Sequence, residues 1–287
     1  MVLAGTTPQS FLRRSINSAP RPAERVSEPT NDPDIEVRTY FARGRNALVA
    51  RGDFSELFAA WYLHRMDYGI EIPAAMEDSG REALAALTLH CASRPWKETC
   101  AWTVKFPNPR VNIFVAGDNN TGTVVANLQT DGLQPVEKGM FYADVVEDSK
   151  PPRRSVVDFY EVSFLRAVEV FYSQSEQRAV RFFWNAEEDL VMVAAQPDCD
   201  EEWLANLDEK SIRSLDRDVE LSLLEKRQYS FRCGCNQDRM LDFMLPVFKR
   251  QAEELFHGDP TITVVCPRCG ARHVLARESL EARNKNE

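Results

Sequence analysis

The sequence predicts an α+β protein in which a mixed β-sheet domain packed with helices is followed by a helical linker and a small cysteine-containing domain. Strand-like and helix-like segments interleave up to about residue 186 without the regular alternation of a doubly wound sheet. Residues 187–230 carry −8 of the net charge of −9, and residues 231–287 hold four of the seven cysteines. We therefore expect a disordered tail over residues 1–34, an α+β core over 35–186, an acidic helical linker over 187–230 and the cysteine-containing domain over 231–287.

The composition is that of an ordinary soluble globular protein, with 44% hydrophobic and 28% charged residues. No run of eighteen apolar residues occurs, so we expect no membrane-spanning segment, and the acidic charge opposes binding to nucleic acid or anionic membrane. Residues 1–34 lack the apolar core of a secretory signal, and Glu24 and Glu28 weaken an organellar targeting interpretation. We expect a cytoplasmic protein, because its reducing compartment leaves thiols free to bind metal or to undergo redox chemistry.

The first part of the core is predicted from its apolar spacing. Residues 45–64 begin as a strand and turn helical, and residues 76–93 form an amphipathic helix. Strand-like alternation marks three segments, namely 99–106, 110–116 and 123–130. The sequence GDNNTG at 117–122 has the composition of a turn and joins the last two strands.

The second part of the core begins after a Pro- and charge-rich loop at 146–155. Dense apolar residues predict a long helix from Val156 to about Gln174. Residues 178–197 then indicate a β-hairpin, whose strands are joined by the polar residues 185–188.

The acidic segment at 198–228 has helical spacing, and Asp198 or Asp200 is a suitable N-terminal start. Its apolar stripe is thin and like charges crowd it, so the predicted helices gain little from packing. Two interpretations remain open: a solvated helical connector and a segment built to unfold. The residues expected to dock the segment, or to bind a client, are Trp203, Leu207, Ile212, Leu215 and Val219.

The four C-terminal cysteines have the spacing of a metal site: Cys233-x-Cys235, thirty residues, then Cys266-x-x-Cys269. Thiolates are soft ligands that favour zinc or iron–sulfur clusters, and two tight pairs are typical of structural zinc sites. A glycine within or beside each pair allows the backbone to turn around a metal. The spacing therefore predicts one Zn²⁺ per chain, held by Cys233, Cys235, Cys266 and Cys269 in the reduced state.

The remaining cysteines give weaker signals. Cys91 and Cys100 fall in a predicted helix and strand, where small core residues are expected, whereas Cys199 opens the acidic segment. His273 follows Cys269 but is not needed once four thiolates are present. The sequence shows no nucleophile-and-base arrangement, phosphate-binding glycine loop or G-x-S-x-G motif, so we do not expect an enzyme.

Several stretches resemble the heat-shock protein 33 family of redox-regulated holdase chaperones. The C-terminal sequences FRCGC and ITVVCPRCGARHVLARESLEA are similar to the zinc domain of that family, and EVFYSQSEQRAVRFFW is similar to one of its helix–strand junctions. The resemblance covers about residues 38–283. Between residues 100 and 155 it is weak, because PNPRVN replaces the Gly-rich segment of the family.

The resemblance implies an ATP-independent chaperone that binds unfolding proteins after oxidation of its zinc centre. Oxidation would join Cys233 to Cys235 and Cys266 to Cys269, eject the metal and unfold the zinc domain and linker; the oxidised form could also form a homodimer. The alternative, from another class, is a constitutive protein-binding module whose zinc ribbon is purely structural. A zinc-ribbon nucleic-acid binder is disfavoured because the C-terminal domain is nearly neutral, and a thiol oxidoreductase is the weakest interpretation.

Overall fold

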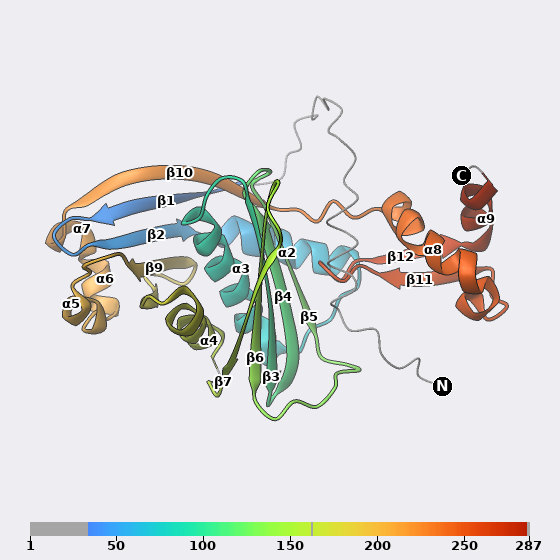
Figure 1. Cartoon of the computed structure of the whole chain (residues 1–287), viewed down its shortest axis with the longest axis horizontal. Coiled ribbons are helices and arrows are strands. Elements are labelled where there is room, and N and C mark those ends of the chain that lie inside the picture. Colours follow the sequence, from blue (N-terminus) through green and yellow to red (C-terminus); the bar gives the residue numbers. More distant parts are fainter. Residues whose placement is uncertain (1–33, 162, 286–287) are drawn as a thin grey trace. The chain divides into compact units, whose positions relative to one another are not determined.

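The computed structural model describes residues 34–161 and 163–285. The predicted disordered tail therefore falls, apart from Asp34, outside the described residues. Within them, ten strands form one sheet in the order β7-β6-β3-β4-β5-β10-β1-β2-β9-β8 (Figure 1). The strands are β1 (Ile35–Ala42), β2 (Ala47–Asp53), β3 (Glu98–Pro107), β4 (Arg110–Asp118), β5 (Thr123–Gln129), β6 (Gly139–Glu147), β7 (Arg153–Phe159), β8 (Val180–Trp184), β9 (Asp189–Ala195) and β10 (Leu221–Phe231).

Strand β10 joins two antiparallel halves of this sheet. It pairs with β1 in antiparallel fashion along most of its length, from Leu221 to Tyr229. Only its end, Ser230 and Phe231, pairs with β5, and that pairing is parallel. The sheet is therefore mixed, as the sequence predicts. Cys233 lies two residues beyond the end of β10. The first cysteine pair therefore follows the strand that joins the two halves of the sheet.

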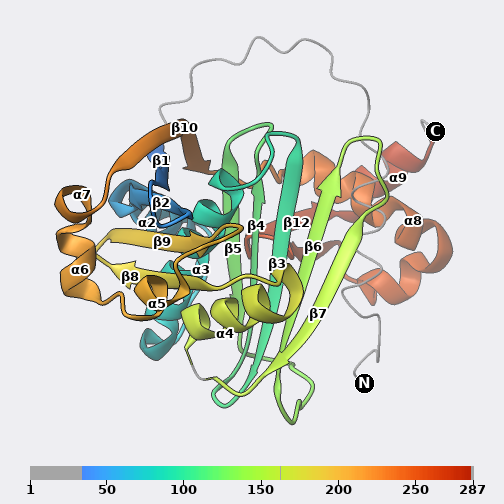
Figure 2. The same cartoon turned by 60° about the vertical axis from the view of Figure 1, so that its left-hand side comes forward.

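The helices of the core bury its apolar interior. They are α2 (Ser55–Asp67), η1 (Ala74–Met76), α3 (Glu77–Ala92), α4 (Phe164–Phe171) and the single π-turn η2 (Tyr172–Glu176). All residues of α3 from Ala83 to Ala92 are buried, and α3 packs against β4, β5 and α4 (Figure 2). Phe141 and Phe171 stack with ring centroids 4.7 Å apart beside the buried Trp102. This core fixes the surface that α2 presents to the cysteine centre.

The helix predicted from Val156 to Gln174 is wrong in its first part. The structure has strand β7 up to Phe159 and begins α4 at Phe164. Val157 and Phe159 are buried while Val156 is half exposed, which is the two-residue alternation of an edge strand. The pairing of Arg154 with Asp144 of β6 ties this edge to the sheet. The apolar residues fit both the helical and the strand period, so the sequence does not show where the strand ends and the helix begins.

The helical interpretation of residues 198–228 holds only as far as Asp218. Three short helices follow β9: α5 (Glu201–Ala205), α6 (Glu209–Arg213) and α7 (Leu215–Asp218). Residues 221–231 form β10 instead, and Arg227 and Tyr229 alternate inward in it. Propensity favours neither state strongly in this charged segment, so pairing with β1 decides.

The C-terminal elements are α8 (Gln237–Phe256), β11 (Thr261–Val265), β12 (Arg272–Ala276) and α9 (Arg277–Lys285). Strands β11 and β12 form an antiparallel hairpin. The apolar cluster formed by these C-terminal elements is small, and its buried members are Leu241, Leu245, Phe248, Phe256, Leu275 and Leu280. Among residues 34–161 and 163–285, no helix combines the length and apolar character needed to cross a bilayer.

Candidate metal centre

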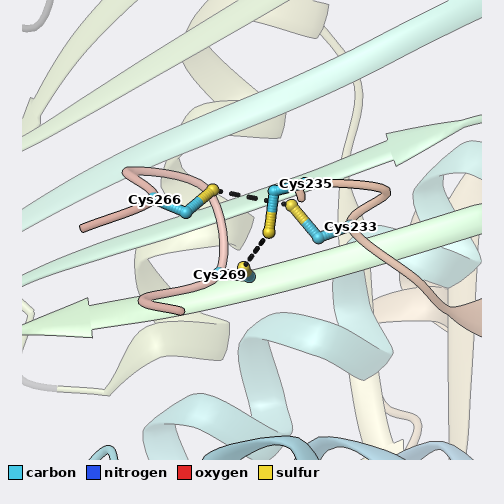
Figure 3. A group of neighbouring side chains, drawn as sticks. All are labelled: Cys233, Cys235, Cys266 and Cys269. Carbon is cyan, nitrogen blue, oxygen red and sulfur yellow. Dashed lines mark hydrogen bonds between the residues drawn. The ribbon is translucent and has the colours of Figure 1, made fainter. Parts of the chain in front are cut away.

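The structure brings the two predicted cysteine pairs together. The four Sγ atoms all lie within 4.8 Å of one another. Cys233 and Cys266 have their sulfurs 3.6 Å apart, and Cys235 and Cys269 have theirs 3.5 Å apart (Figure 3). A tetrahedral zinc ion with Zn–S bonds of about 2.3 Å would hold its sulfurs roughly 3.8 Å apart. The four cysteines therefore fit a zinc ion.

Local backbone geometry explains how each pair is held. Gly234, between the first two cysteines, has a positive φ of 66°, and its carbonyl oxygen accepts a hydrogen bond of 2.7 Å from Arg239 Nη1. The side chain of Asn236 then accepts from the Arg239 amide and begins α8. These contacts place Cys233 and Cys235 on a tight turn between β10 and α8.

The second pair lies on the turn between β11 and β12, which we call the zinc knuckle (residues 266–271). The amide of Gly270 donates to the Cys266 carbonyl at 2.9 Å, and the amide of Cys266 donates to the Ala271 carbonyl at 2.8 Å. Gly270 has a φ of 78°, a backbone conformation that favours glycine. Cys266 and Cys269 are each only 2% exposed, so this half of the centre is shielded from water.

The zinc knuckle docks on the core through its backbone carbonyls. His64 of α2 lies with Nε2 3.2 Å from the Cys269 carbonyl oxygen, and Asn127 of β5 donates from Nδ2 to the Pro267 carbonyl at 3.1 Å. The fit at Gly270 is close: a Cβ there would lie 2.9 Å from Asn127 Oδ1 and 3.1 Å from Ile70 Cδ1. The knuckle is therefore fixed to α2 and β5 as well as to its own hairpin.

Two aromatic groups complete this docking. Tyr68, at the C-terminal end of α2, packs against the cluster of Cys266, Cys269 and Ala271, and its ring centroid lies 5.9 Å from that of His273. His64 packs against Phe231, the last residue of β10, at 5.2 Å. Sequence reasoning missed His64, Tyr68 and Asn127, because they carry no motif and lie at least 140 positions from the knuckle residues they meet.

The electrostatics of the four sulfurs favour a bound cation. Hydrogen bonds from Cys233, then Cys235 and Cys269, lower the pKa of Cys266, so its thiolate forms first. Sharing of these hydrogen bonds, with Cys233 contributing most, raises the pKa of Cys269. Full ionisation of the four thiols therefore needs a positive charge at their centre.

His273 lies beside the centre, outside the predicted ligand set. Its Nε2 is 3.4 Å from Cys235 Sγ, and its side chain is buried. From there the ring can donate a hydrogen bond to the sulfur, as residues around metal ligands commonly do. Its position is compatible with four cysteine ligands.

The predicted docking residues of the acidic segment pack on the half of the sheet that contains β8 and β9, whereas the knuckle contacts β5 in the other half. Leu207, Ile212, Leu215 and Val219 are buried, and Trp203 is partly buried. They form what we call the linker cluster with Phe183, Val191 and Val193 of β8 and β9.

Arginines of the core offset the charge of this segment. Arg45 forms an ion pair with Asp200 and places its guanidinium 5.6 Å from the Trp203 ring centroid. Arg51 contacts Asp216 at 2.9 Å. The acidic segment is therefore neither free nor solvated on its inner side.

Comparison with known proteins identifies relatives of the cysteine-containing part and of the fold. Residues 185–276 match the family model described as Hsp33 protein. The 33 kDa chaperonin of Caldanaerobacter subterraneus subsp. tengcongensis is 30% identical over 73 residues, covering 25% of this chain and 25% of the relative. That of Acholeplasma laidlawii is 29% identical over 58 residues, or 20% of each chain. These alignments therefore cover only about a quarter of the length of either curated relative.

The crystal structure of the 33 kDa chaperonin (heat shock protein 33 homolog) from Thermotoga maritima superposes with a TM-score of 0.66. The match covers 88% of this chain and 98% of that chain, at 15% sequence identity. At this identity the similarity shows the fold.

Proposed function

We propose that this chain, which belongs to the Hsp33 family, is a redox-regulated, ATP-independent holdase that binds unfolding proteins after oxidation. The observation that carries the proposal is the position of the four sulfurs, which lie within 4.8 Å of one another, two of them on a knuckle docked to the core. A chemical change at the sulfurs would therefore alter the contacts between the knuckle and the core.

In the reduced state, Cys233, Cys235, Cys266 and Cys269 would hold one zinc ion. A bound ion would supply the charge compensation that keeps the four thiols deprotonated, and the four cysteines would then connect the end of β10 to the knuckle. Structural zinc contributes on the order of 10 kcal/mol to folding, and the small apolar cluster of α8, β12 and α9 is a weak substitute for it. We therefore propose that residues 231–285 remain folded only while the thiolates are ligated.

Oxidation converts these thiolates into poor ligands. One thiolate attacks a peroxide oxygen to give a sulfenic acid and a hydroxide ion. A neighbouring thiolate then attacks the sulfenic sulfur to form a disulfide and releases a second hydroxide, and each hydroxide takes a proton from solvent to become water. We propose the pairs Cys233–Cys235 and Cys266–Cys269, because only short loops must close.

The contacts of the knuckle supply two routes from the cysteines to the core. One runs through Cys269 and Pro267 to α2 and β5. The other runs back along β10 to the acidic segment, whose helices dock through the linker cluster. Loss of the centre would uncover Tyr68 and Phe231 next to α2, which already exposes Tyr62, Leu63 and Met66.

This mechanism implies unfolding proteins as partners and a cytoplasmic setting in which the resting state is reduced. It requires no catalytic site, nucleic acid or membrane, and an uncovered apolar surface could also pair two oxidised copies. The linker residues Trp203, Leu207, Ile212, Leu215 and Val219 would be released as part of the client surface.

Metal analysis of the reduced protein tests the first step. We expect about one zinc per chain, a ratio near zero in the double variant Cys266→Ser/Cys269→Ser, and an unchanged ratio in Cys199→Ser, a matched control outside the centre. A reduced wild-type protein without zinc, or a double variant that retains it, would remove the basis of the proposal.

A further inference from the structure

A second pair of cysteines lies inside the core, apart from the metal centre. Cys91 is in the last turn of α3 and Cys100 is in β3, and both side chains are fully buried. Neither takes part in the zinc centre or in the contacts that dock the zinc knuckle.

The sheet geometry places the two sulfurs side by side. Cys100 lies directly opposite Gly117 of β4 in the antiparallel pairing, where the Cβ positions of two partners are about 4.5–5.5 Å apart on the same face. A Cβ on Gly117 would lie only 2.7 Å from Cys91 Sγ. The Cys91 sulfur therefore occupies the space that a side chain at 117 would fill, next to Cys100, and each thiol is the largest influence on the pKa of the other.

We propose that Cys91 and Cys100 are a second redox pair, which a peroxide converts into an intrachain disulfide joining α3 to β3. The Cys100 thiolate attacks one peroxide oxygen and becomes a sulfenic acid, while the released hydroxide takes a proton to give water. Cys91 then attacks the sulfenic sulfur and gives up its proton, and the hydroxyl group leaves as a second water. Two thiols and one hydrogen peroxide thus yield one disulfide and two water molecules.

The surroundings assign different parts to the two thiols. A hydrogen bond from Cys91, and then contacts with His90 and Arg94, lower the pKa of Cys100 to about 5, whereas sharing that hydrogen bond and burial raise the pKa of Cys91. Cys100 is therefore the nucleophile, and Cys91 is the protonated partner that completes the bridge. Because both are buried, peroxide must enter during local opening, and the reaction is slower than oxidation at the partly exposed Cys233 and Cys235.

The bridge would act where the metal centre does not. It encloses residues 91–100 and would fasten the end of α3 to the sheet under the oxidising conditions that unfold the cysteine-containing domain. This inference stands on the core geometry alone, and it holds whether or not the metal centre works as a switch.

Peptide mapping of the full chain under non-reducing conditions tests it. The reduced, zinc-loaded protein is treated with hydrogen peroxide at a temperature below its unfolding transition, and free thiols are alkylated before digestion with trypsin. Trypsin leaves Arg94–Pro95 intact and cuts after Lys97, so Cys91 falls in peptide 82–97 and Cys100 in peptide 98–105. We expect these two peptides to be disulfide-linked, while Cys199 in peptide 182–210 is alkylated. Complete alkylation of Cys91 and Cys100 when the zinc cysteines are already oxidised would overturn the inference, as would linkage to any other cysteine.

Denaturant unfolding of the core supplies the second measurement. Oxidation should raise the unfolding midpoint of the wild type and of the matched control Cys199→Ala, but not that of Cys91→Ala. An equal rise in Cys91→Ala would show that another bond stabilises the oxidised core. Because the mapping uses wild-type protein, the inference remains testable if Cys91→Ala does not fold.

Discussion

His64 of α2 and Cys269 of the zinc knuckle are joined by a hydrogen bond from Nε2 to the cysteine carbonyl oxygen, 3.2 Å long. Burial lowers the pKa of His64, which keeps the ring neutral at physiological pH. Because a carbonyl oxygen can only accept, the neutral ring carries its proton on Nε2. The core therefore contacts the backbone of Cys269 and leaves its sulfur free to bind a metal ion.

Replacing His64 should make the metal centre easier to oxidise. In His64→Ala the knuckle loses one of its two core hydrogen bonds and the packing of the ring on Phe231. We expect zinc to stay bound in the reduced protein but to be released several-fold faster by peroxide, as followed with a chromogenic zinc chelator. Leu63→Ala, at an exposed position of the same helix, is the control. Equal release rates in both variants would mean that docking does not protect the thiolates.

Replacing Leu215 should release the acidic segment without oxidation. Leu215 is 2% exposed in the linker cluster, and full burial of such a side chain contributes roughly 1.5–3 kcal/mol. Leu215→Glu adds a buried charge to that loss, so the segment should undock and the reduced protein should act as a holdase with zinc still bound.

Hydrogen exchange over residues 201–218 checks this prediction. The segment should be protected in the reduced wild type and in Leu224→Glu, whose side chain is 56% exposed, but open in Leu215→Glu. If the reduced Leu215→Glu protein stays protected and inactive, the segment is only a tether.

The stability of the core should depend on the ionisation of Glu82. Burial raises the pKa of Glu82 to about 7, although its carboxylate accepts hydrogen bonds from the Leu165 and Phe164 amides. The pKa of Glu82 is higher in the folded than in the unfolded chain, so the folded chain holds the proton more tightly. The stability that this proton contributes is complete below about pH 4.5 and is lost as the pH rises through 7. A shift of one pKa unit corresponds to about 1.4 kcal/mol, and partial exposure reduces the total effect to about 1–2 kcal/mol.

Urea unfolding at pH 5 and pH 8 measures this effect on the reduced protein. The wild type should lose more stability than Glu82→Gln between the two pH values, because the amide cannot ionise. Glu187→Gln, at an exposed position on the same cavity as Asp78 and Arg81, should behave like the wild type. Identical pH dependence in the wild type and Glu82→Gln would show that Glu82 does not titrate in this range.

The disulfide pairing of the metal centre is a separate prediction. In the structure two close sulfur contacts join different pairs, Cys233 with Cys266 at 3.6 Å and Cys235 with Cys269 at 3.5 Å. After metal loss nothing holds these pairs together, so bonds should form within Cys233–Cys235 and within Cys266–Cys269. Tryptic peptide 233–239 should then carry an internal disulfide, and peptide 251–268 should be linked to peptide 269–272. Predominant linkage of peptide 233–239 to either of the others would mean that the metal-held geometry persists during oxidation.

The sequence predicts what depends on local pattern. The α3 helix, the hairpin of β8 and β9, and the cysteine pairs all follow from spacing that a short window contains. The β7 strand and β10 do not, because pairing with β6 and with β1 overrides an apolar pattern that also fits a helix. The docking of the knuckle by His64 and Asn127 cannot be predicted from the sequence, because contacts between residues 205 and 140 positions apart leave no local signal.

Light scattering of a thermally unfolding client protein tests the central claim most directly. The reduced, zinc-loaded chain should leave client aggregation unchanged, whereas the peroxide-oxidised, zinc-free chain at the same concentration should suppress it, and reduction with zinc restored should reverse the effect. A chain that suppresses aggregation equally in both states would be a constitutive binding module with a structural zinc site. A chain that suppresses aggregation in neither state would not be a holdase for that client, and both results contradict a redox-switched chaperone.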